Sequence, residues 1–386
     1  MLKLNRLLYS TVAGDTFSDR IAPTPEQRRI LNEARIAIRE HLRPLISKAT
    51  VTVLKMDKQV EPRFRTQGSW RYGLCLQQAW VSQELDWDYG IYLPVDVWED
   101  NGPPHEMAPL YFNLVEGALK AFCASRGWSL IPGKNTCIRV KISKWAHFDI
   151  PLYAAPAREF QYILEKAARA VSLRADSATP TMDSAAGELD EQEWSELDQI
   201  VLATRSGVWT MSDPESVCRW FEQLEAELKD QFVRVCRYLK AWRDFQWKNA
   251  GGPSSLLLMI ITAQNYESFP GRDDLALEAV AKKLPKALLD AVHESGIDDG
   301  IENFNKLDSD GATGASVKAA ALAAGLKRAL ALPAGSESAA ITIMTEQFGD
   351  RIPTLTHLID TDGGGSVRSV PARTVSRPVI PATKGG

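Results

Sequence analysis

The sequence predicts an α+β protein, with a mixed β-sheet followed by a helical C-terminal lobe. Alternating apolar and polar residues indicate strands at 85–92 and 137–142, whereas helical spacing of apolar residues recurs from residue 214 onward. Apolar residues make up 45% of the 386 residues, which is enough for one large or two ordinary domains.

The first half of the chain is expected to alternate helices and strands. Thr24 followed by Pro25 and Glu26 is typical of a helix start, and Pro44 is expected to perturb the end of that helix. A second helix is expected at 110–126, stopped by Gly127. Strands are expected at 51–54, 85–92, 137–142 and 148–154, and residues 63–65 are expected to lead into the Gly-Ser turn.

The second half of the chain is expected to be helical. Asp213 and Pro214 cap a helix that reaches about residue 229. Further helices are expected at 231–247, from 253, and at 273–295, 314–331 and 336–349. We therefore expect a core at 1–200 that includes an N-terminal helix, and a helical lobe at 201–360.

Two segments differ in composition from the rest. Residues 174–196 are polar and acidic and are expected to form a mobile surface insertion. Residues 361–386 are rich in glycine and proline and are expected to form a tail that is disordered when free.

A carboxylate pair on the 85–92 strand is the most informative motif. Because residues i and i+2 of a strand share a face, Asp86 and Asp88 point together. Adjacent carboxylates repel each other unless a cation lies between them, so a divalent metal is expected. Two Mg²⁺ ions about 4 Å apart are a standard arrangement for in-line attack at phosphorus. Asp149, on a neighbouring strand, completes such a site, and Gly68 and Ser69 suit a phosphate beside it.

The sequence resembles the bacterial cyclic-oligonucleotide synthases, the CD-NTases of CBASS anti-phage systems, and among them the cyclic GMP–AMP synthase branch. The resemblance covers roughly residues 25–350. It rests on the segments 67–69, 84–90, 148–154, 209–214, 238–242 and 253–256, and on Tyr72. It implies a DNA-polymerase-β-like nucleotidyltransferase core and Mg²⁺-dependent synthesis of a cyclic dinucleotide, first of all a cyclic GMP–AMP, from ATP and GTP.

The resemblance also assigns roles to residues. It implies that Asp86, Asp88 and Asp149 are the catalytic residues and the ligands of two Mg²⁺ ions, with Mn²⁺ as an alternative. Contacts to the nucleotides are expected from Gln67, Gly68, Ser69, Tyr72, Arg139, Lys240 and Ser254. Four of these have structural alternatives: Gln67 can hold the loop, Tyr72 can belong to the core, and Arg139 and Lys240 can be solvated.

Partners and location follow from the resemblance and the composition. Related systems imply an E1/E2-like enzyme that conjugates the chain through Gly386, and a downstream effector activated by the cyclic nucleotide. The net charge of −4 argues against a stable complex with nucleic acid. No apolar run reaches 18 residues, so we expect no membrane span and a cytoplasmic protein.

Some residues are expected to have structural roles only. The five cysteines are scattered and odd in number, which favours free buried thiols in a reducing cytosol. The segment that begins at Asp308 resembles the start of an EF-hand, but Ala319 stands where a glutamate is needed. A loop and helix cap are therefore expected at Asp308.

Two other functions fit the same motifs. One is a polymerase-β-like nucleotidyltransferase that modifies RNA or protein, although the acidic sequence disfavours an RNA acceptor. The other is a non-catalytic scaffold that senses nucleotides, against which the three intact carboxylates argue.

Overall fold

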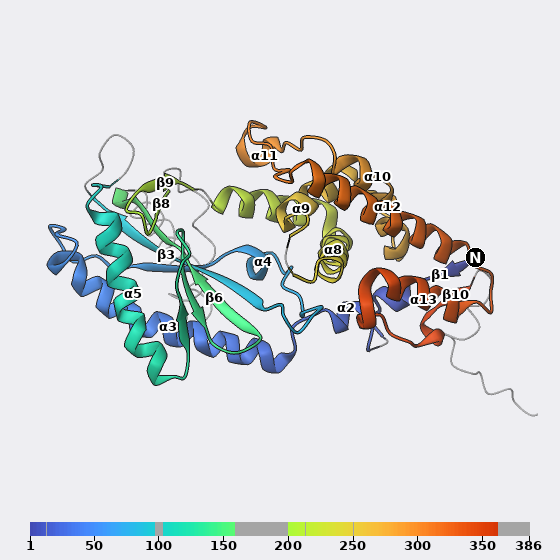
Figure 1. The fold of residues 1–386 in the computed structure, drawn as a ribbon, viewed down its shortest axis with the longest axis horizontal. Helices are drawn as coiled ribbons and strands as arrows, with labels where there is room; N and C mark the ends of the chain where they lie inside the picture. Colours follow the sequence, from blue (N-terminus) through green and yellow to red (C-terminus); the bar gives the residue numbers. More distant parts are fainter. Residues whose placement is uncertain (13, 97–102, 159–199, 213, 250, 362–386) are drawn as a thin grey trace, which may run out of the picture.

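The computed structural model describes residues 1–386 except 13, 97–102, 159–199, 213, 250 and 362–386. The described chain is elongated, with a β-sheet at one end and packed helices at the other (Figure 1). This arrangement confirms the α+β fold class. The insertion expected at 174–196 and, apart from Thr361, the tail expected at 361–386 lie outside the described residues.

Among the described residues, one mixed sheet of eight strands forms the first half of the molecule. It contains β2 (Arg63–Thr66), β3 (Leu85–Val95), β4 (Ser129–Ile131), β5 (Ile138–Lys141), β6 (Ala146–Ile150), β7 (Leu152–Pro156), β8 (Val201–Ala203) and β9 (Trp209–Met211). The strand order is β4-β5-β6-β3-β7-β8-β9, and β2 also pairs with β3. The central strand β3 is parallel to β6 along its first half and to β7 along its second half.

Two helices cover one face of this sheet, α3 (Pro25–Thr52) and α5 (Met107–Ser125) (Figure 1). The odd-numbered residues of β3, including Leu85, Trp87 and Tyr89, are buried in the core that these helices share with the sheet. The alternation along β3 therefore has the predicted consequence, because it leaves Asp86 and Asp88 on the opposite face.

The strand expected at 51–54 is wrong. Helix α3 continues through Pro44 to Thr52, and the backbone N–H groups of Val53 and Leu54 both donate to the carbonyl of Ala49. A proline inside a helix removes one backbone hydrogen bond. Here the buried apolar face of α3 continues past that point and keeps the helix packed on the sheet.

The single strand expected at 148–154 is also wrong, because Pro151 divides it into β6 and β7. Proline has no backbone N–H for a ladder, but its carbonyl accepts a hydrogen bond of 3.0 Å from the N–H of Ile91. At this point the chain passes from one side of β3 to the other.

The other half of the molecule is a helical lobe, which also includes the first two helices of the chain. It contains α1 (Asn5–Leu8), α2 (Phe17–Arg20), α8 (Pro214–Gln246), α9 (Ser255–Asn265), α10 (Asp273–Ala287), α11 (Ser295–Asp298), α12 (Ser309–Ala331) and α13 (Glu337–Phe348), with the 3₁₀ turns Gly349–Arg351 and Thr356–Leu358. The two helices expected on either side of residue 230 are confirmed, because Lys229 breaks α8 with a φ of 66°. The other helices expected beyond residue 250 are present with shifted ends.

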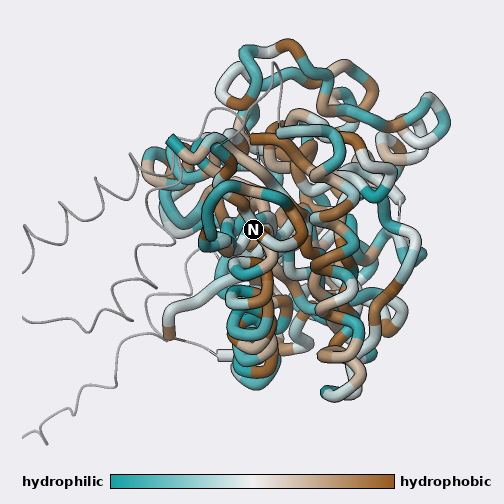
Figure 2. Tube along the Cα trace, turned by 90° about the vertical axis from the view of Figure 1, so that its left-hand side faces the viewer, coloured by the Kyte–Doolittle hydropathy of each residue, from teal (hydrophilic) through white to brown (hydrophobic). Residues whose placement is uncertain are grey.

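The described residues form two main apolar cores, one in each half. In Figure 2 the apolar stretches of the tube lie mainly inside and the hydrophilic stretches outside. The first residues of the chain, Leu2 to Leu8, pack into the core of the helical lobe. There β1 (Leu2–Lys3) pairs with β10 (Asp360–Thr361), at the end of the molecule far from the sheet (Figure 1). The expected domain boundary at 200/201 stays a prediction.

Three smaller expectations can be compared with the structure. All five cysteines are free and buried, as predicted. The carboxylate of Asp308 accepts from the N–H of Gly311 and caps α12, which confirms the expected helix cap. Among the described residues, none of the helices combines the length and the apolar composition that crossing a bilayer requires.

Candidate active site

The register of three adjacent strands positions the acidic residues. Strand β6 lies between β3 and β5. In one row of cross-strand neighbours, His147 stands beside Asp86 on β3. In the next row, Asp149 stands between Asp88 on β3 and Arg139 on β5. Directly opposed residues on a sheet have Cβ atoms about 5 Å apart, so each row brings its side chains together.

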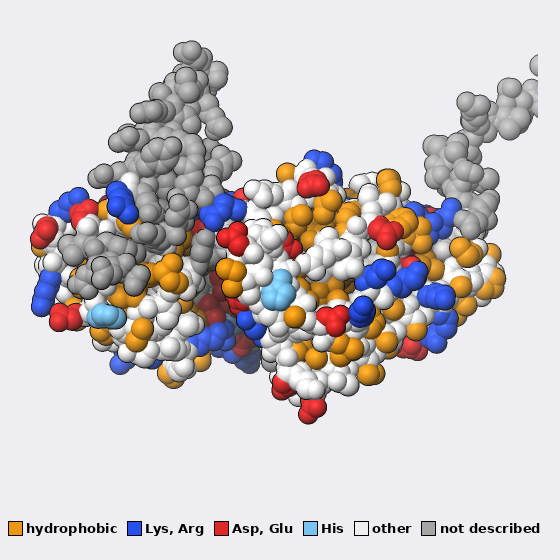
Figure 3. Space-filling view, turned by 90° about the horizontal axis from the view of Figure 1, so that it is seen from above, with side chains coloured by type: hydrophobic (Ala, Val, Ile, Leu, Met, Phe, Trp, Pro, Cys, Tyr) orange, Lys and Arg blue, Asp and Glu red, His pale blue; other side chains and the backbone are white. Residues whose placement is uncertain are grey.

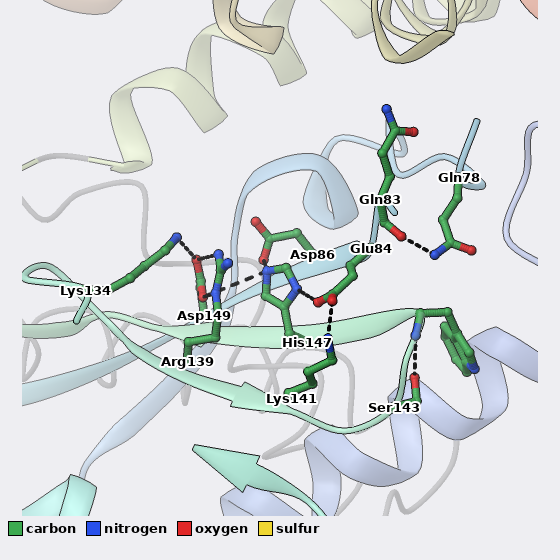
Figure 4. Close-up of polar contacts among 11 residues, drawn as sticks. Gln78, Gln83, Glu84, Asp86, Lys134, Arg139, Lys141, Ser143, His147 and Asp149 are labelled. Atoms are coloured by element: carbon green, nitrogen blue, oxygen red, sulfur yellow. Dashed lines mark hydrogen bonds and ion pairs between the residues drawn. The ribbon is translucent and has the colours of Figure 1, made fainter. Parts of the chain in front are cut away.

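Asp149 is held by two cations (Figure 4). Arg139 donates from Nε to Oδ1 at 2.6 Å and from Nη2 to Oδ2 at 2.7 Å, and Lys134 Nζ donates to Oδ2 at 2.7 Å. Burial opposes ionisation of this carboxyl, but the hydrogen bonds from Arg139 and Lys134 outweigh it. The pKa of Asp149 is therefore lowered, and the side chain is an anion aimed at the cleft.

His147 is buried between two carboxylates (Figure 4). Its Nδ1 lies 2.8 Å from Glu84 Oε2, and its Nε2 lies 3.0 Å from Asp86 Oδ1. Lys141 pairs with the other oxygen of Glu84. Burial lowers the pKa of His147, but the carboxylates of Asp86 and Glu84 outweigh that effect, so the net shift is upward.

Asp88 lies against the backbone of Gly68. A Cβ placed on Gly68 would be 2.2 Å from Asp88 Oδ2, and Gly68 has a φ of +60°. The N–H of Gln67 also donates to the carbonyl of Asp88. Burial, followed by the charges of Asp86 and Asp149, raises the pKa of Asp88 to about 7. Only glycine permits this close approach of loop and carboxylate.

Replacing Gly68 by alanine should therefore damage the site more than the fold. We expect Gly68→Ala to lower the turnover of the proposed reaction by about 100-fold, because a displacement of ~1 Å near reacting groups has that effect. Gly73→Ala is the matched control, since Gly73 also has a positive φ, of +67°, but no atom within 4 Å of its Cβ position. Equal activities of the two variants, measured at equal folded fraction, would contradict the proposed role of this contact.

A large cavity opens between the two halves of the chain, directly over the carboxylates. Its volume is about 1090 Å³, above the usual range for a site that holds one small molecule. In Figure 3 the molecule is hollowed between its halves, and acidic and basic side chains gather there. The charged residues that line the cavity are Glu84, Asp86, Asp88, Lys134, Asp149, Lys240, Arg243, Asp244 and Lys248.

The segment between Ser69 and Asp86 joins the two halves at this cavity. Lys240 Nζ of α8 donates to the carbonyl of Leu74 at 3.0 Å, and Gln83 Nε2 donates to the carbonyl of Asp244 at 2.6 Å. Trp80 Nε1 donates to the carbonyl of Phe245 at 2.9 Å. The long interval between the Gly-Ser turn and the carboxylate pair therefore forms one wall of the cleft.

A buried polar network supports the Gly-Ser turn from behind. Gln67 Nε2 donates to the hydroxyl of Tyr92 at 2.5 Å, and that hydroxyl donates to Glu215 Oε1 at 3.3 Å. Arg65 Nη2 pairs with Glu215 Oε2 at 2.6 Å, with both side chains at least 96% buried. Because Glu215 belongs to the first turn of α8, this network ties the loop in the sheet half to the helical lobe.

Comparison with known families identifies the chain. Residues 62–153 match the family described as "Cyclic GMP-AMP synthase DncV-like, nucleotidyltransferase domain", and residues 229–361 match "Cyclic GMP-AMP synthase, C-terminal domain". The chain belongs to the DncV-like CD-NTase family. The resemblance that the motifs indicated is thus confirmed, and both halves of the DncV-like fold are represented.

Individual relatives agree with this assignment. A curated cyclic GMP-AMP synthase of Escherichia coli is 35% identical over 232 residues, which are 58% of this chain and 53% of that protein. The chain thus spans about half the length of the curated relatives it matches. A Vibrio cholerae DncV mutant in complex with ATP, GTP and 5MTHFGLU2 is 25% identical, with a TM-score of 0.75 over 93% of this chain and 99% of that one. A second Vibrio cholerae DncV structure, in complex with the linear intermediate 5′ pppA(3′,5′)pG, has the same identity, a TM-score of 0.73, and coverage of 93% and 98%.

The structure of this CD-NTase brings most of the predicted nucleotide-binding residues to the cavity. Gln67, Gly68, Ser69, Tyr72 and Lys240 line it. The amide of Gln67 is engaged with tyrosine hydroxyls, which supports its alternative role of holding the loop. Tyr72 contacts both the cavity and the helical core, where its ring lies 5.3 Å from that of Phe221. The roles of these residues in binding nucleotides stay predictions.

Two predicted residues are placed differently. The hydroxyl of Ser254 accepts from the N–H of Leu257 and caps α9, whereas the next residue, Ser255, lines the cavity. Ser255 Oγ also accepts a hydrogen bond from Arg243 at 3.1 Å. Arg139 donates two hydrogen bonds to Asp149, and its side chain is 23% exposed. Its contact with a phosphate stays a prediction.

Several site residues were not found by the sequence reasoning. His147 carried a usable signal, because it stands two residues before Asp149 on one strand and so shares its face. No local pattern in the sequence distinguishes three other cavity residues, Lys134, Arg243 and Lys248, from the cations elsewhere on the surface.

The donor set fits a divalent metal. Single ligand atoms of Asp86, His147 and Asp149 all lie within 4.8 Å of one another. Asp86 Oδ1 is buried and has no hydrogen-bond partner among the described residues. Buried carboxylate oxygens of this kind suit a hard cation such as Mg²⁺. Asp88 lies beside this group, turned toward Gly68.

Proposed function

We propose that this protein synthesises a cyclic dinucleotide, and specifically a cyclic GMP–AMP, from ATP and GTP. The observation that carries the proposal is the cavity of about 1090 Å³. Its floor holds three carboxylates on two paired strands, and its walls carry lysines from both halves of the chain. A cavity of this size and charge suits two nucleoside triphosphates whose reacting groups meet above the carboxylates.

Under this proposal the residues act as follows. Asp86, Asp88 and Asp149 would hold two Mg²⁺ ions, which would supply electrostatic stabilisation at the attacking and leaving oxygens. Asp149 also helps to accept the proton of the attacking ribose hydroxyl. Lys240, at the cavity wall, is placed to contact a triphosphate as a point charge. Burial lowers the pKa of Lys240, and an anionic phosphate would counter that effect.

The two transfers of such a synthesis use one site. The first joins the α-phosphate of one triphosphate to a ribose hydroxyl of the other and releases pyrophosphate. After the linear product has turned around, the second joins its remaining α-phosphate to the ribose hydroxyl of the other nucleotide, which closes the ring and releases a second pyrophosphate. The Vibrio cholerae relative crystallised with a linear 5′ pppA(3′,5′)pG intermediate supports this order.

Incubation of the protein alone with ATP, GTP, CTP, UTP and Mg²⁺ tests the proposal. We expect a phosphatase-resistant product with the mass of a cyclic GMP–AMP, whose linkages digestion with linkage-specific nucleases will assign. Chelation of divalent ions should stop its formation. A product built only from UTP and CTP would refute the purine assignment, and the absence of any cyclic product would refute the synthase.

The two alternative functions give different results in the same assay. A transferase that modifies RNA or protein should label an added macromolecule and form no small cyclic product. A nucleotide-sensing scaffold should bind ATP or GTP without turnover. The carboxylates gathered at the cavity favour catalysis over a scaffold, because ionisation of Asp88 beside Asp86 and Asp149 is opposed unless a cation binds there.

The biological setting is part of the proposal. We infer an anti-phage role in which the product activates a downstream effector in the cytoplasm, since the CD-NTase family implies such systems. Conjugation by an E1/E2-like enzyme through Gly386 stays a prediction, and Gly386 lies outside the described residues.

Shortening the chain tests that last prediction. The cut belongs after Thr361, because Thr361 pairs with Leu2 in the β1–β10 ladder. We expect synthesis in vitro to survive this cut, since the cavity is untouched. Conjugates in cells that carry the partner enzymes should disappear. Conjugates that persist would place the attachment point elsewhere.

A further inference from the structure

His147 has the environment of a metal-ligating histidine. Its side chain is 93% buried, and its Nε2 faces Asp86 Oδ1 at 3.0 Å and Asp149 Oδ1 at 4.0 Å. Neither Nε2 of His147 nor Oδ1 of Asp86 has a hydrogen-bond partner among the described residues. These two buried atoms lie at ion-pair distance but without hydrogen-bond geometry, so a metal ion that joined them would satisfy both.

The other side of the imidazole ring is fixed. His147 Nδ1 lies 2.8 Å from Glu84 Oε2, and Lys141 pairs with the second oxygen of Glu84. A carboxylate that accepts a hydrogen bond from one ring nitrogen leaves the other nitrogen free to bind a metal ion, and metal-bound histidines usually have such a carboxylate partner. Figure 4 shows the ring lying between Glu84 on one side and Asp86 on the other.

We propose that Asp86, His147 and Asp149 form a site for a divalent transition-metal ion, with His147 Nε2 as its nitrogen ligand and Glu84 as the residue that orients the ring. The ligand atoms lie within 4.8 Å of one another, so one ion can reach all three. Imidazole nitrogen favours later transition-metal ions such as Co²⁺ and Zn²⁺, whereas Mg²⁺ and Mn²⁺ suit oxygen ligands better.

This inference rests on the proposed function, because Asp86 and Asp149 are also among the proposed ligands of the Mg²⁺ ions. Asp88 is not part of it, since that carboxylate is turned toward Gly68. Lys134, whose side chain is 41% exposed, can leave Asp149 when an ion enters. The consequence is that a transition-metal ion occupies the nucleotide-free protein and competes there with Mg²⁺.

Cobalt binding to the full chain, free of nucleotide and Mg²⁺, tests the site. Co²⁺ is followed by its visible absorption bands, and Zn²⁺ is then added to displace it. We expect wild type to bind Co²⁺ with bands that His147→Gln changes in position and intensity. Glu84→Gln should weaken Co²⁺ binding about 10- to 100-fold, and His147→Gln by at least as much. His293→Gln and His357→Gln, at exposed histidines, are the matched controls and should match wild type.

Other results of the Co²⁺ experiment would overturn the proposed metal site. If His147 is only a charged bridge between Glu84 and Asp86, its removal takes away a competing cation, and His147→Gln will bind Co²⁺ as tightly as wild type or more tightly. That result overturns the proposal, as do unchanged bands in His147→Gln. Should His147→Gln fail to fold, Glu84→Gln decides in the same way, with unchanged affinity as the overturning outcome.

The experiment also separates this inference from the proposed function. Asp88→Asn should lose synthesis but keep the Co²⁺ bands, because Asp88 is not a ligand of the transition-metal site. Loss of synthase activity in every assay with normal Co²⁺ bands would reject the synthase and leave the metal site standing. Normal synthesis with no Co²⁺ bands in wild type would do the reverse.

Discussion

Asp88→Asn is expected to abolish synthesis of the cyclic dinucleotide while leaving the fold intact. The substitution keeps the shape of the side chain and removes one charge from the proposed ligands of the metal pair. Loss of a metal ligand should lower the rate on the order of a thousandfold or more. The measurement is product formation from ATP and GTP in Mg²⁺, with near-wild-type turnover as the result that contradicts the proposed site.

Stability provides the control for this variant. Burial and the neighbouring carboxylates raise the pKa of Asp88 to about 7, so its ionised form is disfavoured in the folded protein. A neutral asparagine removes that repulsion, and the melting midpoint of Asp88→Asn should equal or exceed that of wild type. Asp57→Asn, at an exposed aspartate, is the matched substitution and should retain full activity.

Glu215→Ala is expected to destabilise the fold more than any of the other substitutions proposed for this protein. It removes the carboxylate that pairs with the buried guanidinium of Arg65, and breaking a buried ion pair in this way costs about 3–5 kcal/mol. It also removes the acceptor of the Tyr92 hydroxyl behind the Gly-Ser turn. The free energy of unfolding, measured in urea, should fall accordingly.

Two comparisons decide whether the buried charge is responsible. Glu222→Ala removes the partner of Arg71, a pair that also joins α8 to the sheet half but whose glutamate is 46% exposed, and should cost under about 1 kcal/mol. The double variant Arg65→Met with Glu215→Leu removes both charges and should recover most of the stability. A loss in Glu215→Ala no larger than that in Glu222→Ala would show that the buried pair is not a support of the fold.

Local patterns in the sequence predicted the elements that depend on near neighbours. The alternation along residues 85–92 predicted which face of β3 is buried, and that face is the one in the core. Thr24 and Asp308 were correctly predicted as helix caps. The errors came where a distant partner overrides the local signal, as in the helical segment 51–52, which the packing of α3 extends beyond Pro44.

The candidate site could be predicted in part. The sequence identified Asp86, Asp88 and Asp149, and the structure places them on adjacent strands at one cavity. It did not identify His147, although its spacing from Asp149 is the same as that of Asp86 from Asp88. The strand pattern alone does not mark a histidine as a site residue. That inference needs the carboxylate of Asp86 on the neighbouring strand, which only the fold places beside it.

The sequence by itself determined which segments have the periodicity of strands or of helices, which face of β3 is buried, and where the carboxylate motif lies. These features follow from the geometry of neighbouring residues. The tertiary structure alone decided the partners. Because of the register of β6 between β3 and β5, Asp149 lies beside Arg139, and His147 lies beside Asp86. The N-terminal residues join the core of the helical lobe through contacts some 270 positions away, such as Leu4 with Asp274. Such pairings depend on how whole elements pack and on the register of their strands, which no short window of sequence specifies.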